Sequence, residues 1–314
     1  MKKTLPSVAV LLCLAAGLFY FCQSARPPIN ALKIPGAEEE ENRELREEWD
    51  RMRLGDPETG QIPQGISRKE RLFAAGLPMA VTERSGPDWE SRGPWNVGGR
   101  TRALAIDVAD ENRILAGGVS GGIWLSEDGG QTWTRRTPLN ALPSCVSIAQ
   151  DTRPGHTDTW YYLSGELYGN SAGATGAYYL GDGAFKSTDG GLTWAPLGAT
   201  DNGSVESFTE SWQGCWRIVT NPAVAEDEVY AAVYGTIYKS TNGGTSWTVA
   251  LNSPTSYATD VAVASTGVVF ATVSSDGVAG GFWRYQNGVP WTKINPDTSA
   301  GFPANFDRFV IGIN

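Results

Sequence analysis

Aromatic and acidic side chains gather in two stretches of this sequence, residues 165–185 (GELYGNSAGATGAYYLGDGAF) and residues 196–214. Aromatic rings beside carboxylates can hold a sugar or a peptide, and two acids at a suitable separation can hydrolyse a glycosidic bond. An alternative also fits, in which Tyr178 and Tyr179 only pack a loop rich in glycine and alanine. The ligand-binding candidates of the two stretches are Tyr168, Tyr178, Tyr179, Trp212, Glu166, Asp182, Glu206 and Glu210.

The residues needed for other common chemistries are scarce. His156 is the only histidine and lies in the sequence PGHTD, so a Ser-His-Asp triad would depend on it alone. One histidine, with Cys145 and Cys215 as the cysteines outside the leader, makes no zinc-ligand pattern. The paired glycines also lack the surroundings of a phosphate-binding loop. We therefore predict no catalytic residue, no metal and no cofactor.

Arg100 and Arg102 allow two interpretations. Neighbouring arginines can form an anion site, because a guanidinium group binds a carboxylate or a phosphate through two parallel hydrogen bonds. They can equally form salt bridges or cap carbonyl groups. Both interpretations remain open from the sequence.

A repeated octapeptide, here called the box, must position these residues. It reads SEDGGQTW at 126–133, STDGGLTW at 187–194 and STNGGTSW at 240–247. An acidic or amide residue before two glycines is typical of a tight hairpin, and the tryptophan can pack between neighbouring sheets. Asn242 keeps the acceptor oxygen without the charge, which favours a structural role over an acid–base or metal role. The structural residues are Ser126, Asp128, Gly129, Gly130, Trp133, Ser187, Asp189, Gly190, Gly191, Trp194, Ser240, Asn242, Gly243, Gly244 and Trp247.

The spacing of the boxes predicts an all-β fold, a β-propeller of four-stranded blades. Three units have the same length, 19 positions, from the end of the first strand to the box (107 to 126, 221 to 240 and 265 to 284), whereas the second unit (151 to 187) carries an insertion. Blade geometry puts this insertion and the loop 196–214 on the side opposite the boxes. We expect an incomplete propeller of about four blades plus orphan strands at Trp89–Asn96 and Arg308–Asn314.

Cys145 and Cys215 occupy the same repeat position, six residues before Asp151 and Asn221 respectively. They would start the inner strands of adjacent blades. A disulfide between these blades is the expected arrangement, with two free buried thiols as the alternative.

The three boxes resemble those of the BNR or Asp-box propeller proteins, whose signature is SxDGGxTW, and the resemblance covers roughly residues 89–314. Members include sialidases, xyloglucanase-type glycoside hydrolases, sortilin-like domains and photosystem assembly factors. The resemblance implies a propeller fold, but it does not transfer the known catalytic residues. Val119 stands where xyloglucanase-type enzymes carry their catalytic base, and no arginine-isoleucine-proline motif of a sialidase precedes the boxes. Residues 56–78 and 93–107 are also similar to exported proteins of type IX secretion.

The N-terminal sequence predicts export. Lys2 and Lys3 precede an apolar run and small residues, so residues 1–24 are expected to be a signal peptide, 25–85 a linker with a helical extension, and 86–314 the propeller. The helices are expected at 37–55 and 67–75. Lipidation of Cys22 stays open. The net charge of −9 disfavours nucleic acid as a partner. No integral membrane segment is expected after cleavage, and the mature protein would be secreted or held at the cell surface.

The sequence therefore predicts a secreted binding or interaction module whose ligand is a glycan or a protein, without catalysis of its own. The alternative is a glycoside hydrolase, of xyloglucanase-like or sialidase-like type, with its acids on the loop side or in further blades. A surface-scaffold role is a third possibility.

Overall fold

The computed structural model describes residues 43–77, 99–138, 141–167, 179–201, 208–253, 258–275, 279–286, 288–295 and 303–313. The predicted signal peptide, the orphan strand Trp89–Asn96 and the candidates Tyr168, Tyr178 and Glu206 lie outside these ranges. The chain divides into two units, Met1–Asp50 and Arg51–Asn314, and every strand belongs to the second unit.

Before the strands, the described residues contain the helices α2 at Arg43–Leu54 and α3 at Ile66–Gly76. The first ends at Leu54, one residue before the end of the expected range 37–55. The second begins earlier than predicted, because Gly65 takes the N-cap position in the left-handed conformation and no side chain caps the helix. Ser67, the first residue of the expected helix, is therefore already inside it.

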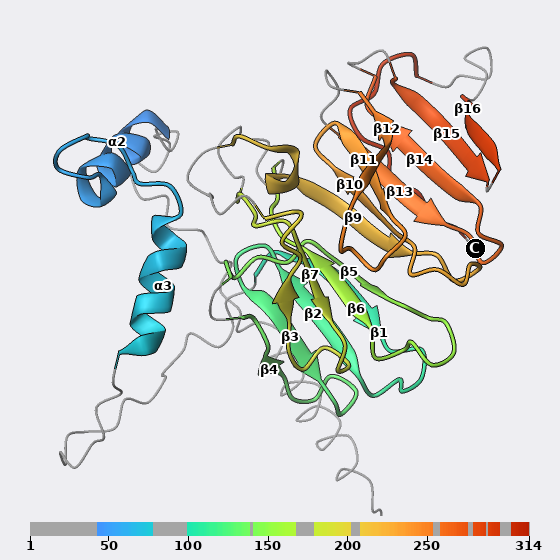
Figure 1. The fold of residues 1–314 in the computed structure, drawn as a ribbon, viewed down its shortest axis with the longest axis horizontal. Helices are drawn as coiled ribbons and strands as arrows, with labels where there is room; N and C mark the ends of the chain where they lie inside the picture. Colours follow the sequence, from blue (N-terminus) through green and yellow to red (C-terminus); the bar gives the residue numbers. More distant parts are fainter. Residues whose placement is uncertain are drawn as a thin grey trace, which may run out of the picture. The chain divides into compact units, whose positions relative to one another are not determined.

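In the described part of the chain, sixteen strands form four antiparallel sheets, each with its strands in sequence order (Figure 1). Such four-stranded meanders are propeller blades, which confirms the predicted fold class. Blade 1 contains β1 (Thr101–Ile106), β2 (Ile114–Gly118), β3 (Gly122–Ser126) and β4 (Thr134–Arg135). Blade 2 contains β5 (Ser147–Gln150), β6 (Trp160–Leu163), β7 (Ala184–Ser187) and β8 (Ala195–Pro196). Blade 3 contains β9 (Cys215–Thr220), β10 (Val229–Val233), β11 (Thr236–Ser240) and β12 (Thr248–Asn252). Blade 4 contains β13 (Thr259–Val263), β14 (Val269–Val273), β15 (Gly281–Gln286) and β16 (Val289–Lys293).

The first strands of successive blades pack beside one another, β1 by β5, β5 by β9 and β9 by β13. The Ile218 amide donates to Ser147 Oγ (3.1 Å), and Thr220 Oγ1 donates to the Gln150 carbonyl (2.7 Å). Because the residue numbers rise together on both strands, β5 and β9 run in the same direction. The starts of β9 and β13 also lie close together. Thr259 Oγ1, at the start of β13, donates to the carbonyl of Val233, and Val233 is paired with Cys215, the first residue of β9. The inner strands therefore all begin at the same end of the blade array.

Apolar side chains fill the spaces between the blades. Between blades 1 and 2, Leu115 and Ile123 pack with Tyr162 and Phe185, whose rings stack at 4.5 Å. Separate clusters join blade 2 to blade 3 and blade 3 to blade 4. Burial of this apolar surface holds neighbouring sheets together, since no strand that the structure describes forms a backbone ladder with the next blade.

The boxes form one repeated hydrogen-bonded turn. Ser126 Oγ donates to Asp128 Oδ1 (2.8 Å) and accepts from the Gly130 amide (2.8 Å), while the Thr132 amide donates to Asp128 Oδ1 (2.8 Å). The second and third boxes repeat these bonds, with Asn242 Oδ1 accepting from the Ser246 amide (2.9 Å). Both glycines of each box have positive φ, which a residue with a Cβ adopts only with strain. The predicted turn role of these residues is confirmed.

Acid should weaken the first box. Hydrogen bonds from the side chain and backbone of Thr132 and from Ser126 lower the pKa of Asp128 to about 2. The ordinary aspartate pKa is about 3.9, so the stabilisation by this carboxylate is fully present above about pH 4 and is lost as the pH falls toward 2. We expect Asp128→Asn to lose less stability than the wild type over this interval, because residue 128 then no longer titrates, as in the natural box with Asn242. Thermal melts of both proteins from pH 5 to pH 2 test this, and parallel curves would contradict it.

The predicted disulfide is not formed, because both cysteines are free buried thiols. Cys145 lies in the core between blades 1 and 2, whereas Cys215 lies in the core between blades 2 and 3. Cys215 Sγ donates to the Trp212 carbonyl (3.1 Å). Burial raises the pKa of both thiols, which keeps them protonated. The shared repeat position therefore places the cysteines in two successive cores, and the open alternative of two buried thiols is confirmed.

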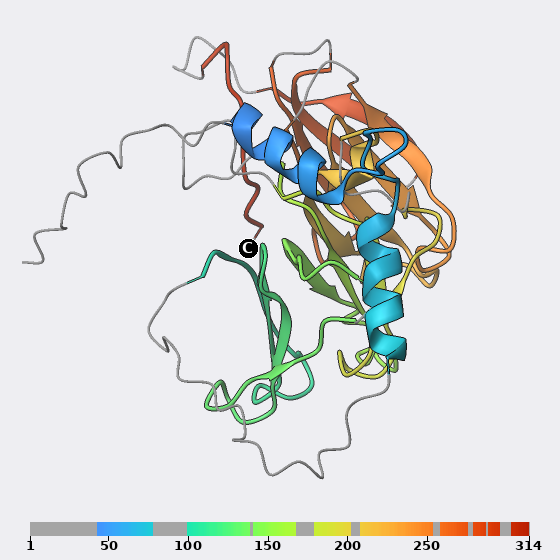
Figure 2. The same cartoon turned by 90° about the vertical axis from the view of Figure 1, so that its left-hand side faces the viewer.

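The expected strand Arg308–Asn314 is an extended segment without a sheet over its described residues, the red trace in Figure 2. Side chains of blade 4 bind its backbone: Thr272 Oγ1 donates to the Phe309 carbonyl (3.0 Å), and the Ile311 amide donates to Asp260 Oδ2 (2.7 Å). Phe309 packs on Phe282 at 5.1 Å. Side-chain partners thus satisfy backbone groups that a sheet would otherwise pair.

Candidate binding site at the start of the inner strands

Glu166 lies at the neck of the insertion in blade 2, held by two backbone hydrogen bonds with Tyr179 (2.8 and 2.7 Å). Its side chain is only 1% exposed and forms ion pairs with Arg100 Nη2 (2.9 Å) and Arg102 Nε (3.1 Å). Burial raises the pKa of Glu166, although Arg102 and Arg100 oppose the shift. Of the two interpretations left open for these arginines, the salt-bridge role is confirmed, and it joins blade 1 to blade 2.

Asp182 lies at the other end of the insertion and is also buried. Its amide donates to Ser164 Oγ (2.8 Å), and its carboxylate is 3.9 Å from Arg68 Nη2 of α3. Arg68 Nη1 is 2.7 Å from Asp201, which is in the loop after β8. Burial raises the pKa of Asp182, and Arg68 lowers it in part. The guanidinium group of Arg68 on α3 thus forms ion pairs with the carboxylates of both Asp182 and Asp201.

The remaining described candidates are less available than the sequence suggested. Trp212 belongs to the core, where it stacks on Tyr238 (4.8 Å) and meets Trp247 edge-on (5.1 Å). Glu210 is exposed but caps the short 3-10 helix Ser211–Gln213 through a reciprocal capping box with Gln213. Tyr179 is half-buried. The structure therefore places Glu166 beside Tyr179. Trp212 is buried in the core, so it is not part of an exposed aromatic surface.

The sequence reasoning missed three further charged residues: Arg308, which interacts electrostatically with Glu166, and Arg217 and Asp260, which interact with Arg308. Arg217 Nε on β9 pairs with Asp260 Oδ1 on β13 (3.1 Å), and Arg217 Nη1 donates to the Ile311 carbonyl (2.7 Å). Arg308, from the C-terminal segment, lies 4.7 Å over the ring of Trp216. The sequence repeat could have identified these charged residues, because they recur at similar positions in successive units. Arg102, Arg217, Asp260 and Arg308 each stand four to six positions before the aligned residues 107, 221, 265 and 314.

These residues form one electrostatic group, here called the axial cluster: Arg100, Arg102, Glu166, Arg217, Asp260 and Arg308. Burial lowers the pKa of Arg308, Asp260 and Glu166 raise it, and Arg102 and Arg217 lower it by like-charge repulsion. Arg308 therefore interacts electrostatically with charged residues of all four blades. Four arginines face two carboxylates, so the cluster is positive in a chain whose net charge is −9.

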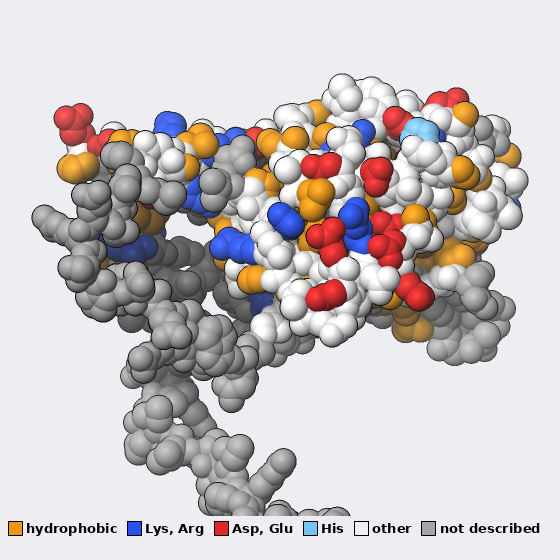
Figure 3. All heavy atoms as spheres, turned by 90° about the horizontal axis from the view of Figure 1, so that it is seen from below, with side chains coloured by type: hydrophobic (Ala, Val, Ile, Leu, Met, Phe, Trp, Pro, Cys, Tyr) orange, Lys and Arg blue, Asp and Glu red, His pale blue; other side chains and the backbone are white. Residues whose placement is uncertain are grey.

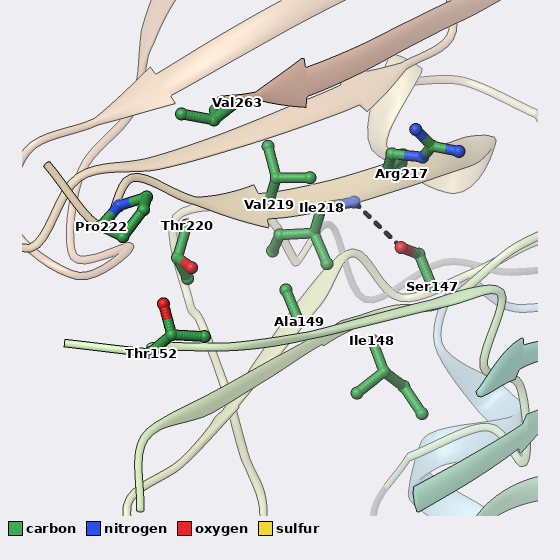
Figure 4. A pocket seen from close by; sticks show the side chains of 10 residues that line it. All are labelled: Ser147, Ile148, Ala149, Thr152, Arg217, Ile218, Val219, Thr220, Pro222 and Val263. Atoms are coloured by element: carbon green, nitrogen blue, oxygen red, sulfur yellow. Dashed lines mark hydrogen bonds between the residues drawn. The ribbon is translucent and has the colours of Figure 1, made fainter. Parts of the chain in front are cut away.

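A groove of about 390 Å³ runs along the inner strands next to Arg217 (Figure 4). Strands β5 and β9 form most of it, and Val263 of β13 closes one side. Its lining mixes hydroxyl groups with aliphatic side chains, which suits a small polar ligand with apolar faces. The lining residues are Ser147, Ile148, Ala149, Thr152, Arg217, Ile218, Val219, Thr220, Pro222 and Val263.

A second charged group lies on the box side, where the single histidine is visible at the surface (Figure 3). Asp151, His156 and Asp227 are close enough to share a metal ion. Arg153 already occupies the position between the two carboxylates, and its Nη1 donates to the carbonyls of Ala225 (2.7 Å) and Glu226 (3.0 Å). The hydrogen bond from Arg153 lowers the pKa of Asp227. This group is therefore a latch between blades 2 and 3 built around an internal cation.

No protein-family model matches the chain. Among curated proteins it is similar to a xyloglucanase of Paenibacillus sp., with 27% identity over 240 residues, covering 66% of this chain and 22% of that protein. It is also similar to a xyloglucanase of Hypocrea jecorina (strain QM6a), with 25% identity over 250 residues, covering 77% of this chain and 23% of that protein. The chain thus spans less than a quarter of the length of these relatives.

Solved structures with a similar arrangement include an ancestral GH74 enzyme (TM-score 0.46, 22% identity, covering 62% of this chain and 25% of that one). Another is YCF48 from Cyanidioschyzon merolae (TM-score 0.41, 16% identity, covering 66% and 59%). A third is an auxiliary nutrient binding protein from Bacteroides thetaiotaomicron VPI-5482 (TM-score 0.41, 13% identity, covering 62% and 42%). The propeller architecture itself follows from the four-sheet topology.

Within the described residues, neither helix has the length and apolar character that crossing a membrane requires.

Proposed function

We propose that this chain is part of a secreted Asp-box propeller that binds a glycan without cleaving it. The observation that carries the proposal is the burial and arginine pairing of its two candidate acids, Glu166 and Asp182. Glu166 and Asp182 are both buried, and arginine side chains occupy the space in front of their carboxylates. The groove beside the axial cluster offers hydroxyl and aliphatic groups to a ligand.

Glycoside hydrolysis needs an acid that reaches the leaving oxygen and a second carboxylate on the other side of the bond. Glu166 is 1% exposed and its two oxygens face Arg100 and Arg102. A substrate would have to displace both guanidinium groups before Glu166 could transfer a proton. Binding alone requires no such displacement, so the geometry supports a binding role better.

A glycoside hydrolase is the second candidate, and the sequence similarity to two xyloglucanases favours it. Burial raises the pKa of Glu166 and of Asp182, which is the direction that a general acid needs. In this case Glu166 or Asp182 would be the acid, and the arginine contacts would open when substrate binds.

Affinity electrophoresis on a panel of soluble polysaccharides that includes xyloglucan, with a reducing-sugar assay on the same mixtures, separates the candidates. The proposal expects retardation on at least one polysaccharide and no release of reducing ends. Release that disappears in Glu166→Gln or Asp182→Asn, but persists in the exposed control Glu127→Gln, would establish the hydrolase instead. Absence of retardation on every polysaccharide would overturn the binding proposal.

A further inference from the structure

The axial cluster carries more positive charge than its own carboxylates neutralise. Glu166 already uses two arginines, Arg100 and Arg102, and Asp260 uses Arg217. Two ion-paired carboxylates therefore stand against four guanidinium groups. Excess charge in a half-buried position is costly unless a counter-ion approaches, because part of its hydration is lost.

Within the described ranges, Arg308 is the arginine of the axial cluster that has no carboxylate in an ion pair with it. Among the described residues it forms no ion pair within 4 Å; its guanidinium group lies over Trp216, and its Nε is buried without a hydrogen-bond acceptor. Like-charge repulsion from Arg102 and Arg217 adds to its burial in lowering its pKa, yet an arginine stays protonated at neutral pH. An unpaired cation is thus fixed in place against an aromatic ring.

The arginines of the axial cluster already bind carboxylate groups, those of Glu166 and Asp260. Both carboxylates of the cluster bind arginine there, at 2.9 to 3.1 Å. A guanidinium group can add a further carboxylate through charge-assisted hydrogen bonds. The neighbouring groove, with Arg217 in its lining, offers hydroxyl and aliphatic groups on which a sugar ring could lie (Figure 4).

We propose that the axial cluster binds the carboxylate of an acidic glycan through Arg308, with the adjoining groove holding the neighbouring sugar. This inference rests on the proposed glycan-binding function and names its ligand class, a uronate-bearing polysaccharide. Because the whole chain is acidic, the attraction is local to the cluster, and salt should weaken it.

Matched ligands test the inference on the full chain. Oligogalacturonate and its fully methyl-esterified form differ only in the free carboxylates, and isothermal titration calorimetry with each measures their contribution. We expect the free acid to bind about tenfold tighter or more, the typical effect of a charge-assisted hydrogen bond. Arg308→Gln should remove this preference. Arg284→Gln should keep it, because Arg284 is exposed on β15 and its Nη2 donates to Gln286 Oε1 (2.8 Å).

The outcomes separate this inference from the proposed function. Equal affinity of the wild-type protein for the acid and the ester overturns the carboxylate site while leaving glycan binding intact, and this comparison needs no variant to fold. A preference that survives in Arg308→Gln overturns the role of Arg308. Binding of no glycan at all overturns the proposed function as well. Binding of a peptide with a free C-terminal carboxylate, in place of every glycan, overturns the choice of ligand.

Discussion

Replacing Arg153 with methionine is expected to lower the free energy of unfolding by about 3 to 5 kcal/mol, the usual effect of removing one partner of a buried ion pair. Arg153 is 8% exposed, and its guanidinium group holds the buried Asp151 and the half-buried Asp227. It also donates to two carbonyl groups between β9 and β10. The substitution keeps most of the side-chain volume, so the loss comes from an uncompensated carboxylate and from acceptors left without a donor.

Arg113 provides the control for this experiment. It pairs with the exposed Glu127 at 3.1 Å and reaches the Gly190 carbonyl at only 3.5 Å. Arg113→Met should cost at most about 1 kcal/mol, because exposed ion pairs contribute little. Urea unfolding of both variants measures the difference. The double variant Asp151→Asn with Arg153→Met should recover part of the stability, and a single Arg153→Met within about 1 kcal/mol of wild type would contradict the latch.

Replacing Trp194 with alanine should also cost about 3 to 5 kcal/mol, the range for deleting a buried large aromatic side chain. Trp194 is 8% exposed and meets the ring of Tyr162 edge-on at 4.9 Å in the core between blades 1 and 2. The second and third boxes pack on the preceding blade: Gly191 lies against Leu115, and Gly244 lies against Leu197. Loss of Trp194 thus opens a cavity between two sheets.

Trp133 is a matched control within the same motif. Its Nε1 donates to the Gly130 carbonyl at 3.0 Å, as Trp194 Nε1 does to the Gly191 carbonyl at 3.0 Å, so both alanine variants lose the same hydrogen bond. Trp133 is however 38% exposed, because its box has no preceding blade among the described residues. We expect Trp133→Ala to cost less than half as much in denaturant unfolding. Equal losses would show that the turn, and not the packing between blades, sets the contribution of the tryptophan.

The boxes and the blades could be predicted because their determinants are local. Each turn is closed by bonds between residues at most four positions apart, such as Ser126 with Gly130, and it needs glycines with positive φ. The equal spacing from strand to box then implies a repeated four-stranded unit. For the same reason the sequence showed that the second unit carries an insertion, and the structure places this insertion between β6 and β7.

Contacts between blades could not be predicted in this way. The equivalent positions of Cys145 and Cys215 suggested a disulfide, but successive positions in a propeller face successive cores. The burial of Trp212, just before β9, depends on Tyr238 and Trp247, which lie further along the chain in blade 3.

The sequence by itself determined the strand order, the box turns and the side of the blades on which the insertion emerges, because hydrogen bonds over a few residues and a fixed repeat length decide them. Only the tertiary structure decided that Glu166 pairs with Arg100 and Arg102 and that Arg308 belongs to the axial cluster. These residues are far apart in the chain, and the packing of whole sheets brings them within electrostatic range of one another.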